Sequence, residues 1–142
     1  YARSVWAMIS LNTRKPADLL ALHGGSIVDY VCDEPCPIEK PSRIKVTSAE
    51  PASSLNAKYS DIDINGHVNS IRYIEHILDL FPIELYKESR IRRFEMAYVA
   101  ESYYGDELTF YKDYVGNGTY DIEVRKNGGE AVCRSKVIFV EK

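Results

Sequence analysis

The chain has little cysteine and no long apolar run. Its 142 residues include three cysteines, and these have neither CxxC pairing nor companion histidines at zinc-finger spacing: Cys32, Cys36 and Cys133. This pattern supports neither a disulfide framework nor a structural zinc site, so we expect a reducing compartment and no metal ion. No motif calls for a cofactor. Because no apolar stretch approaches the length of a bilayer span, we also expect no membrane span.

The sequence also lacks an excess of positive charge. The formal net charge is -3, so no basic field is available to attract a nucleic acid backbone, and we expect no nucleic acid partner. Hydrophobic residues make up 45% and charged residues 27%, a composition typical of globular proteins. A chain of this length can bury roughly two thirds of its unfolded surface. A substantial core is therefore expected.

The chain divides into three segments of different character. Residues 1–14 are rich in β-forming and aromatic residues and predict a strand. Residues 15–51 hold five of the six prolines and predict a linker, with a short helix that begins near Pro16 and ends at Gly24 and Gly25. Residues 52–142 have the regular patterning of a folded domain.

The third segment predicts one helix and a sheet. After a strand over 55–62, apolar residues recur at three- and four-residue steps from about Asn69 until Pro82 stops the helix: Ile71, Ile74, Ile77, Leu78 and Phe81. This face should be buried, with His76 exposed on the other side. Strands are expected over 91–104, 107–115, 118–126 and 131–141, the last three joined by Asn-Gly turns as an antiparallel meander. A single amphipathic helix must bury its apolar face against this sheet, so the fold class is α+β.

Polar residues gather just before this helix. Asp63, Asn65 and His67 occupy alternate positions, which would aim their side chains the same way in an extended stretch. Gly66 leaves room for close backbone approach, and the N–H groups here, those of Gly66 and Val68, could hold a developing oxyanion. This combination suits acyl transfer. The alternative is that the aspartate and asparagines only cap the helix and shape a turn.

Three stretches resemble one enzyme family. The segment "DIDINGHVNSIRYIEHILDLFP" (61–82) resembles the signature of acyl-acyl carrier protein (acyl-ACP) thioesterases, which consist of two tandem hotdog domains. The segments "FEMAYVAESYYGDEL" (94–108) and "SVWAMISLNTRKP" (4–16) resemble the family's strand with a catalytic glutamate and its interdomain region. The resemblance covers nearly the whole chain, as the C-terminal half. It implies a hotdog, in which an antiparallel sheet wraps one long helix, over 52–142, preceded by the last strand of an upstream hotdog over 1–14.

The resemblance also implies catalytic residues. It assigns roles to Asp63, Asn65, His67 and Glu101 in hydrolysis of the thioester of a fatty acyl-ACP. An acid would activate water or attack the carbonyl itself, while His67 and Asn65 position the carbonyl or the water. Ser102 stands where plant members carry a cysteine, so it could be a nucleophile only with a nearby base, and we favour the carboxylates. By position alone, Glu101 and Glu95 would both be ordinary solvated acids.

Substrate and partners are expected to follow the family. The expected partner is an acyl carrier protein, and a basic group could dock this acidic protein or simply be a solvated face: Lys87, Arg90, Arg92 and Arg93. The alternatives are an acyl-CoA thioesterase and a non-catalytic acyl-binding domain. Gly66 differs from the larger residue of plant members, which favours a bacterial, cytoplasmic protein over a plastid one. Without an upstream half, an open sheet edge predicts self-association, such as a homodimer.

Overall fold

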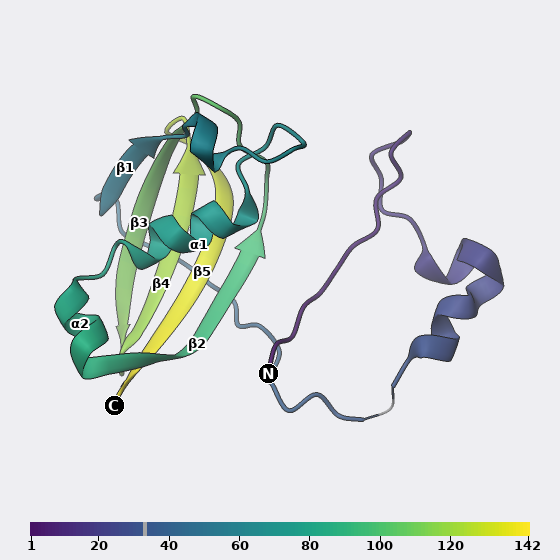
Figure 1. Ribbon diagram of the computed structural model, residues 1–142, viewed down its shortest axis with the longest axis horizontal. Coiled ribbons are helices and arrows are strands. Elements are labelled where there is room, and N and C mark those ends of the chain that lie inside the picture. Colours follow the sequence, from purple (N-terminus) through teal and green to yellow (C-terminus); the bar gives the residue numbers. More distant parts are fainter. Residues whose placement is uncertain (33) are drawn as a thin grey trace. The chain divides into compact units, whose positions relative to one another are not determined.

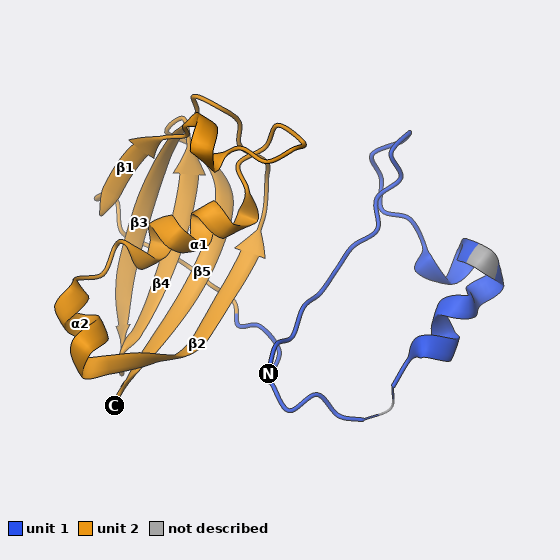
Figure 2. Ribbon diagram, viewed as in Figure 1, with its two compact units in different colours: residues 1–42 blue, residues 43–142 orange. Residues whose placement is uncertain are grey.

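The computed structural model describes residues 1–32 and 34–142, which form two units (Figure 2). Unit 1 comprises residues 1–42 and unit 2 residues 43–142. Asp33, within the predicted linker, lies outside the described residues. The second unit begins earlier than the expected boundary at residue 52, because main-chain N–H groups of Thr47 and Ser48 donate to the Asp113 carboxylate at 2.6 and 3.1 Å.

In the described part of unit 1, a 3-10 helix, η1, covers Leu19–Tyr30. The Asp18 carboxylate caps it by accepting from the N–H of Leu20 at 2.9 Å. The helix continues past Gly24 and Gly25, which do not stop it as expected. The strand predicted over 1–14 does not form either. A strand requires a hydrogen-bonded neighbour, and the described part of unit 1 supplies only an isolated bridge between Ile9 and Pro16. Its membership of an upstream sheet stays a prediction.

Unit 2 is an antiparallel sheet with α1 lying across one face (Figure 1). The sheet has the strand order β1-β3-β4-β5-β2, with strands at Ser53–Asn56 (β1), Ser89–Tyr98 (β2), Glu107–Gly116 (β3), Thr119–Lys126 (β4) and Glu130–Glu141 (β5). Strands β3, β4 and β5 form the predicted meander. The expected strand over 55–62 is shorter, because a 3-10 turn, η2, occupies Tyr59–Asp61.

Helix α1 spans Ser70–Leu78 and begins where the sequence predicted, because the Asn69 side chain accepts from the N–H of Ile71 at 3.0 Å. A second helix, α2 (Ile83–Glu88), follows Pro82. The buried face of α1 agrees in part with the prediction, because Ile77 and Phe81 are buried as expected, but Tyr73 is buried in place of Ile71. Tyr73 and Ile77 are 3% and 0% exposed, whereas Ile71 is 58% exposed. The helix therefore presents a tyrosine to the core.

The core lies between α1 and the inner face of the sheet. Most of its fully buried apolar strand residues alternate in sequence, as one-sided burial requires: Leu108, Phe110, Ile122, Val124, Val137. Val132, next to Cys133, is also fully buried and interrupts the alternation where the β4–β5 register shifts. Cys133 packs among them as predicted, and burial raises the pKa of its thiol to about 12. The opposite face is polar: Glu123 accepts from both Arg125 and Arg134 at 2.7 Å.

The β3–β4 turn permits a stability test. Gly118 has φ +68°, and a side chain there would overlap the carbonyl oxygen of Phe139. The two residues are held close together because the N–H of Phe139 donates to the Gly118 carbonyl at 2.9 Å. We expect Gly118→Ala to lower the free energy of unfolding by about 3 kcal/mol or more in urea titrations. Gly128→Ala is the matched control, because Gly128 has φ +80° with open space around it and should cost only about 1–2 kcal/mol. Equal losses in the two variants would contradict the expectation.

Candidate active site

The site loop, residues 62–69, is a tight turn that leads into α1. An isolated bridge joins Ile62 to Val68, and the N–H of Asp63 donates to the His67 carbonyl at 2.8 Å. Gly66 lies at the tip with φ +81°, a backbone conformation that glycine adopts without steric cost. The loop is therefore held by its own main chain before any side chain contributes.

The Asp63 carboxylate belongs to this turn. Its Oδ1 accepts the N–H groups of Asn65 and His67 at 2.8 and 3.2 Å. Desolvation acts to raise the pKa of Asp63, but the hydrogen bonds from the N–H groups of Asn65 and His67 outweigh it and lower the pKa. A carboxylate stabilised in this way stays charged and is a weak base. The turn-shaping role that the sequence left open for Asp63 is thus present in the structure.

His67 and Glu101 meet at the same end of the sheet. The segment after β2, which carries Glu101, lies beside the site loop (Figure 1), and an isolated bridge joins His67 to Tyr103. The His67 Nε2 atom lies 3.6 Å from Glu101 Oε2, with the side chains 29% and 51% exposed. A partly exposed imidazole and a solvent-accessible carboxylate therefore lie next to each other.

Ser102 lies behind this pair and is buried. It is 1% exposed, and its Oγ has no hydrogen-bond partner in the described structure. Its carbonyl accepts the N–H of Val68 at 2.8 Å, which joins the Glu101 segment to the site loop. Among residues 1–32 and 34–142, no hydrogen bond joins the Ser102 hydroxyl to a base. The structure therefore gives no support to Ser102 as a nucleophile.

The two N–H groups expected to hold an oxyanion are already in use. The N–H of Gly66 donates to the Asp63 carbonyl at 3.0 Å, and that of Val68 donates to Ser102. Both N–H groups therefore already have an acceptor within the protein, and the role of Gly66 and Val68 in holding an oxyanion stays a prediction. The side chains of His67 and Asn65 remain as groups that can polarise a carbonyl; Asn65 is exposed at the loop tip.

Two further contacts were not predicted. The Tyr103 hydroxyl donates to Glu101 Oε2 at 3.1 Å. At the base of the site loop, His76 Nε2 lies 3.2 Å from the buried carboxylate of Asp61, so the expectation that His76 is exposed is wrong. A tyrosine in a loop has no sequence pattern that would predict its contact with Glu101. The Asp61–His76 pair could not be predicted because it depends on how η2 packs against α1.

The predicted basic group is not uniform. Arg93 Nε lies 2.5 Å from Glu95 Oε1, and Glu95 is buried, so neither residue is the solvated charge that was expected. Arg90 and Arg92 are exposed. Lys87 is also exposed and lies 4.0 Å from Glu84 within α2. Only three of the four cations are therefore placed to meet a partner without breaking a buried ion pair.

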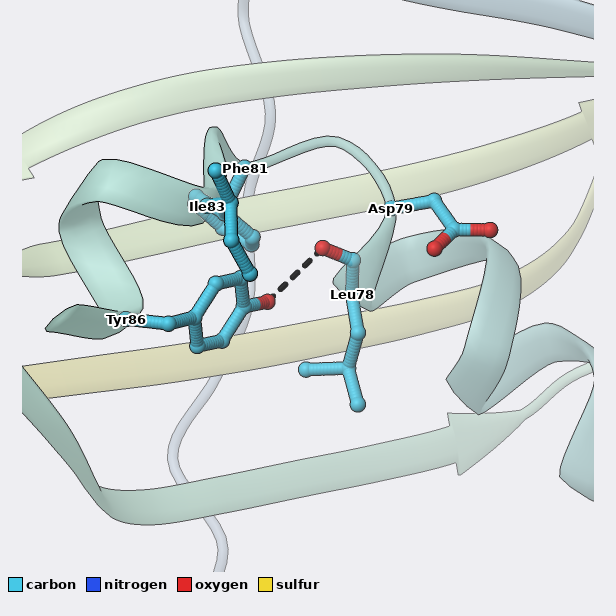
Figure 3. Close-up of a pocket in the computed structure, with 5 residues that line it drawn as sticks. All are labelled: Leu78, Asp79, Phe81, Ile83 and Tyr86. Carbon is cyan, nitrogen blue, oxygen red and sulfur yellow. Dashed lines mark hydrogen bonds between the residues drawn. The ribbon is translucent and has the colours of Figure 1, made fainter.

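A cavity of about 330 Å³ lies elsewhere, between the end of α1 and α2 (Figure 3). It is lined by Leu78, Asp79, Phe81, Ile83 and Tyr86, and the Tyr86 hydroxyl donates to the Leu78 carbonyl at 2.7 Å. The cavity is far along α1 from the site loop and holds none of the predicted catalytic groups. We therefore place the candidate site at the His67–Glu101 pair, where an imidazole and a carboxylate lie close together.

Two negative findings apply to residues 1–32 and 34–142. No three histidine, cysteine, aspartate or glutamate side chains there are grouped in a way that could hold a metal ion. No helix in this part of the chain combines the length and apolar character needed to cross a membrane.

The sheet and the helix α1 that lies across it define a hotdog fold. The solved 12:0-ACP thioesterase from Umbellularia californica has the same fold, with a TM-score of 0.74 over 94% of this chain and 53% of that one, at 19% identity. The hotdog prediction is thus confirmed.

The chain belongs to the acyl-ACP thioesterase family, since residues 44–141 match the model of the acyl-ACP thioesterase C-terminal domain. The solved acyl-ACP thioesterase from Bacteroides thetaiotaomicron is 76% identical, with a TM-score of 0.86 over 93% of this chain and 53% of that one. Dodecanoyl-[acyl-carrier-protein] hydrolase of Cinnamomum camphora is 28% identical over 103 residues, or 69% of this chain and 27% of the relative. The chain thus spans about half the length of each of the two solved relatives and about a quarter of the length of the Cinnamomum camphora hydrolase.

Proposed function

We propose that this chain is the catalytic C-terminal half of an enzyme that hydrolyses the thioester of fatty acyl-ACP and so ends fatty acid synthesis. The observation that carries the proposal is the His67–Glu101 contact, at 3.6 Å, in a chain of this family. Acyl-ACP as the substrate follows from the family and from the 76% identity with a bacterial acyl-ACP thioesterase. That identity also supports a bacterial source, for which we propose a cytoplasmic setting.

Glu101 is the base in this proposal. It accepts a proton from water as the water oxygen attacks the thioester carbonyl, and the tetrahedral intermediate then expels the carrier thiolate. A thiol with a pKa near 8.5 leaves without strong acid assistance, so activation of water is the harder step. Glu101 suits this role better than Asp63, because Glu101 is half exposed beside His67, whereas Asp63 is bonded to its own loop.

The other site residues position the substrate. The His67 imidazole and the Asn65 amide polarise the carbonyl, and Asp63 maintains the loop that carries both residues. Ser102 links the two segments through its carbonyl and takes no covalent part. This division of labour replaces a Cys-His-Asn mechanism, for which this chain has no cysteine at position 102.

Side-by-side hydrolysis tests the substrate. Purified protein is given acyl-ACP and acyl-CoA of the same chain length, and thiol release is followed together with free fatty acid. We expect a higher kcat/KM for acyl-ACP. A preference for acyl-CoA would overturn the carrier-protein assignment, and acyl binding without turnover would overturn hydrolysis altogether.

The exposed cations support carrier-protein docking. Carrier proteins are acidic, and a basic patch raises the rate of encounter with them. We expect Arg90→Glu with Arg92→Glu to raise KM for acyl-ACP by about three- to tenfold at low salt, with no change for a small soluble thioester. Arg93 is left intact, because its Glu95 partner is buried. Equal effects on both substrates would contradict docking at these residues.

We also propose that the chain self-associates. Strands β1 and β2 form the two edges of the sheet, and apolar side chains near the site are exposed: Ile64, Tyr98 and Val99. Open edges and exposed apolar surface favour pairing with another chain. Light scattering at micromolar concentration should give a mass above that of one chain; a strictly monomeric species would contradict this.

A further inference from the structure

We infer that Tyr103 is a positioning residue that orients the Glu101 carboxylate for the proposed reaction. The inference rests on the proposed function, since it assigns to Tyr103 an effect on turnover through Glu101. Tyr103 follows Glu101 by two residues, so in an extended segment both side chains are directed the same way. Its hydroxyl donates to Glu101 Oε2 at 3.1 Å.

Tyr103 contacts both members of the pair. Its ring packs edge-on against the His67 ring, with centroids 5.3 Å apart, and its main chain forms the bridge to His67. The tyrosine thus touches the imidazole with its ring and the carboxylate with its hydroxyl. A glutamate that is 51% exposed would otherwise sample many rotamers. Holding the Oε2 atom beside Nε2 raises the fraction of time in which the pair is arranged for catalysis.

Tyr103 is itself held in place. The Asp106 carboxylate accepts the N–H of Tyr103 at 2.9 Å and a side-chain N–H of Asn127 at 2.9 Å. The hydrogen bond from Asn127, and then that from Tyr103, lower the pKa of Asp106. On the other side, Lys126 Nζ donates to the Glu101 carbonyl at 2.7 Å and lies 5.9 Å from the Tyr103 ring. The contacts of the turn after β2 therefore fix the position of Tyr103 beside Glu101.

The adjacent tyrosine provides a matched control. Tyr104 is 71% exposed, whereas Tyr103 is 47% exposed. We expect Tyr103→Phe to lower kcat for acyl-ACP by about five- to tenfold with KM unchanged, because only the hydroxyl that orients the base is lost. Tyr104→Phe should leave both constants unchanged. Tyr103→Leu should lower kcat further, because the contact with the His67 ring is lost too.

A double variant separates this inference from the proposed function. In a Glu101→Gln background, Tyr103→Phe should reduce the residual rate no further, because the hydroxyl acts through Glu101. A kcat for Tyr103→Phe equal to that of wild type, a change in KM alone, or an additive loss in the double variant would overturn the positioning role. If Glu101→Gln by itself kept full turnover, Glu101 would not be the base and the positioning role would fail with it. The proposed function fails on a different result, namely wild-type protein that binds acyl-ACP without hydrolysing it.

Discussion

Replacing Glu101 by glutamine is expected to lower kcat for acyl-ACP hydrolysis by about 10²–10⁴-fold, the usual contribution of a general base. Glutamine keeps the size of the side chain and a carbonyl oxygen that can accept from Tyr103, but it cannot accept a proton from water. Because the change leaves the exposed surface nearly intact, KM and the melting temperature should stay close to wild type. Steady-state kinetics with a thermal melt of the same sample measures all three.

The control for this variant is Glu84→Gln, the same change at an exposed position on α2. It should leave kcat unchanged. If Glu101→Gln retained turnover within about threefold of wild type, which corresponds to less than 0.7 kcal/mol of barrier, Glu101 would not be the base.

Asp63→Ala and Asp63→Asn are expected to differ, and the difference reveals the role of Asp63. Alanine removes the acceptor for the N–H groups of Asn65 and His67, so the loop loses its shape and kcat should fall by about 10²-fold or more. Asparagine keeps an acceptor oxygen while losing the charge, and kcat should fall by only about tenfold. Loss to the same level in both variants would show that the charge itself takes part in the reaction.

The pH dependence of stability provides a second test of the role of Asp63 in the site loop. Its pKa is lowered in the folded protein, so the folded state favours the charged form. The stabilisation is therefore fully present above the ordinary aspartate pKa of about 3.9 and is lost as the pH falls through the lowered value. Wild type should exceed Asp63→Asn in free energy of unfolding at pH 7, and the gap should close below about pH 4. A constant gap would contradict this origin.

Local signals predicted much of the fold. The helix starts at Asn69 and the two Asn-Gly turns join strands because these residues carry their own backbone preferences. The buried face of α1 was harder to predict, since hydropathy favours Ile71 over Tyr73, although a tyrosine can bury its ring while its hydroxyl approaches other polar groups. Alternation likewise groups residues by face without showing that Glu95 is buried against Arg93.

The sequence named the residues of the candidate site but not the contacts between them. The motif around His67 and the resemblance named both residues of the His67–Glu101 pair, but neither says where a carboxylate points. Asp63 turns back onto its own loop because two N–H groups two and four residues later lie within reach, a local competition that spacing alone does not resolve. The availability of the Gly66 N–H also depends on turn geometry.

The oxygen that enters the product tests the central claim most directly. Enzyme in excess over acyl-ACP is quenched after one turnover in ¹⁸O-labelled water, and the fatty acid and the protein are analysed by mass spectrometry. Activation of water by Glu101 predicts one labelled oxygen in the fatty acid and unlabelled, unacylated protein. Label in the carboxylate of Glu101 or Asp63, or an acyl group on Ser102, would instead establish covalent catalysis and contradict the claim.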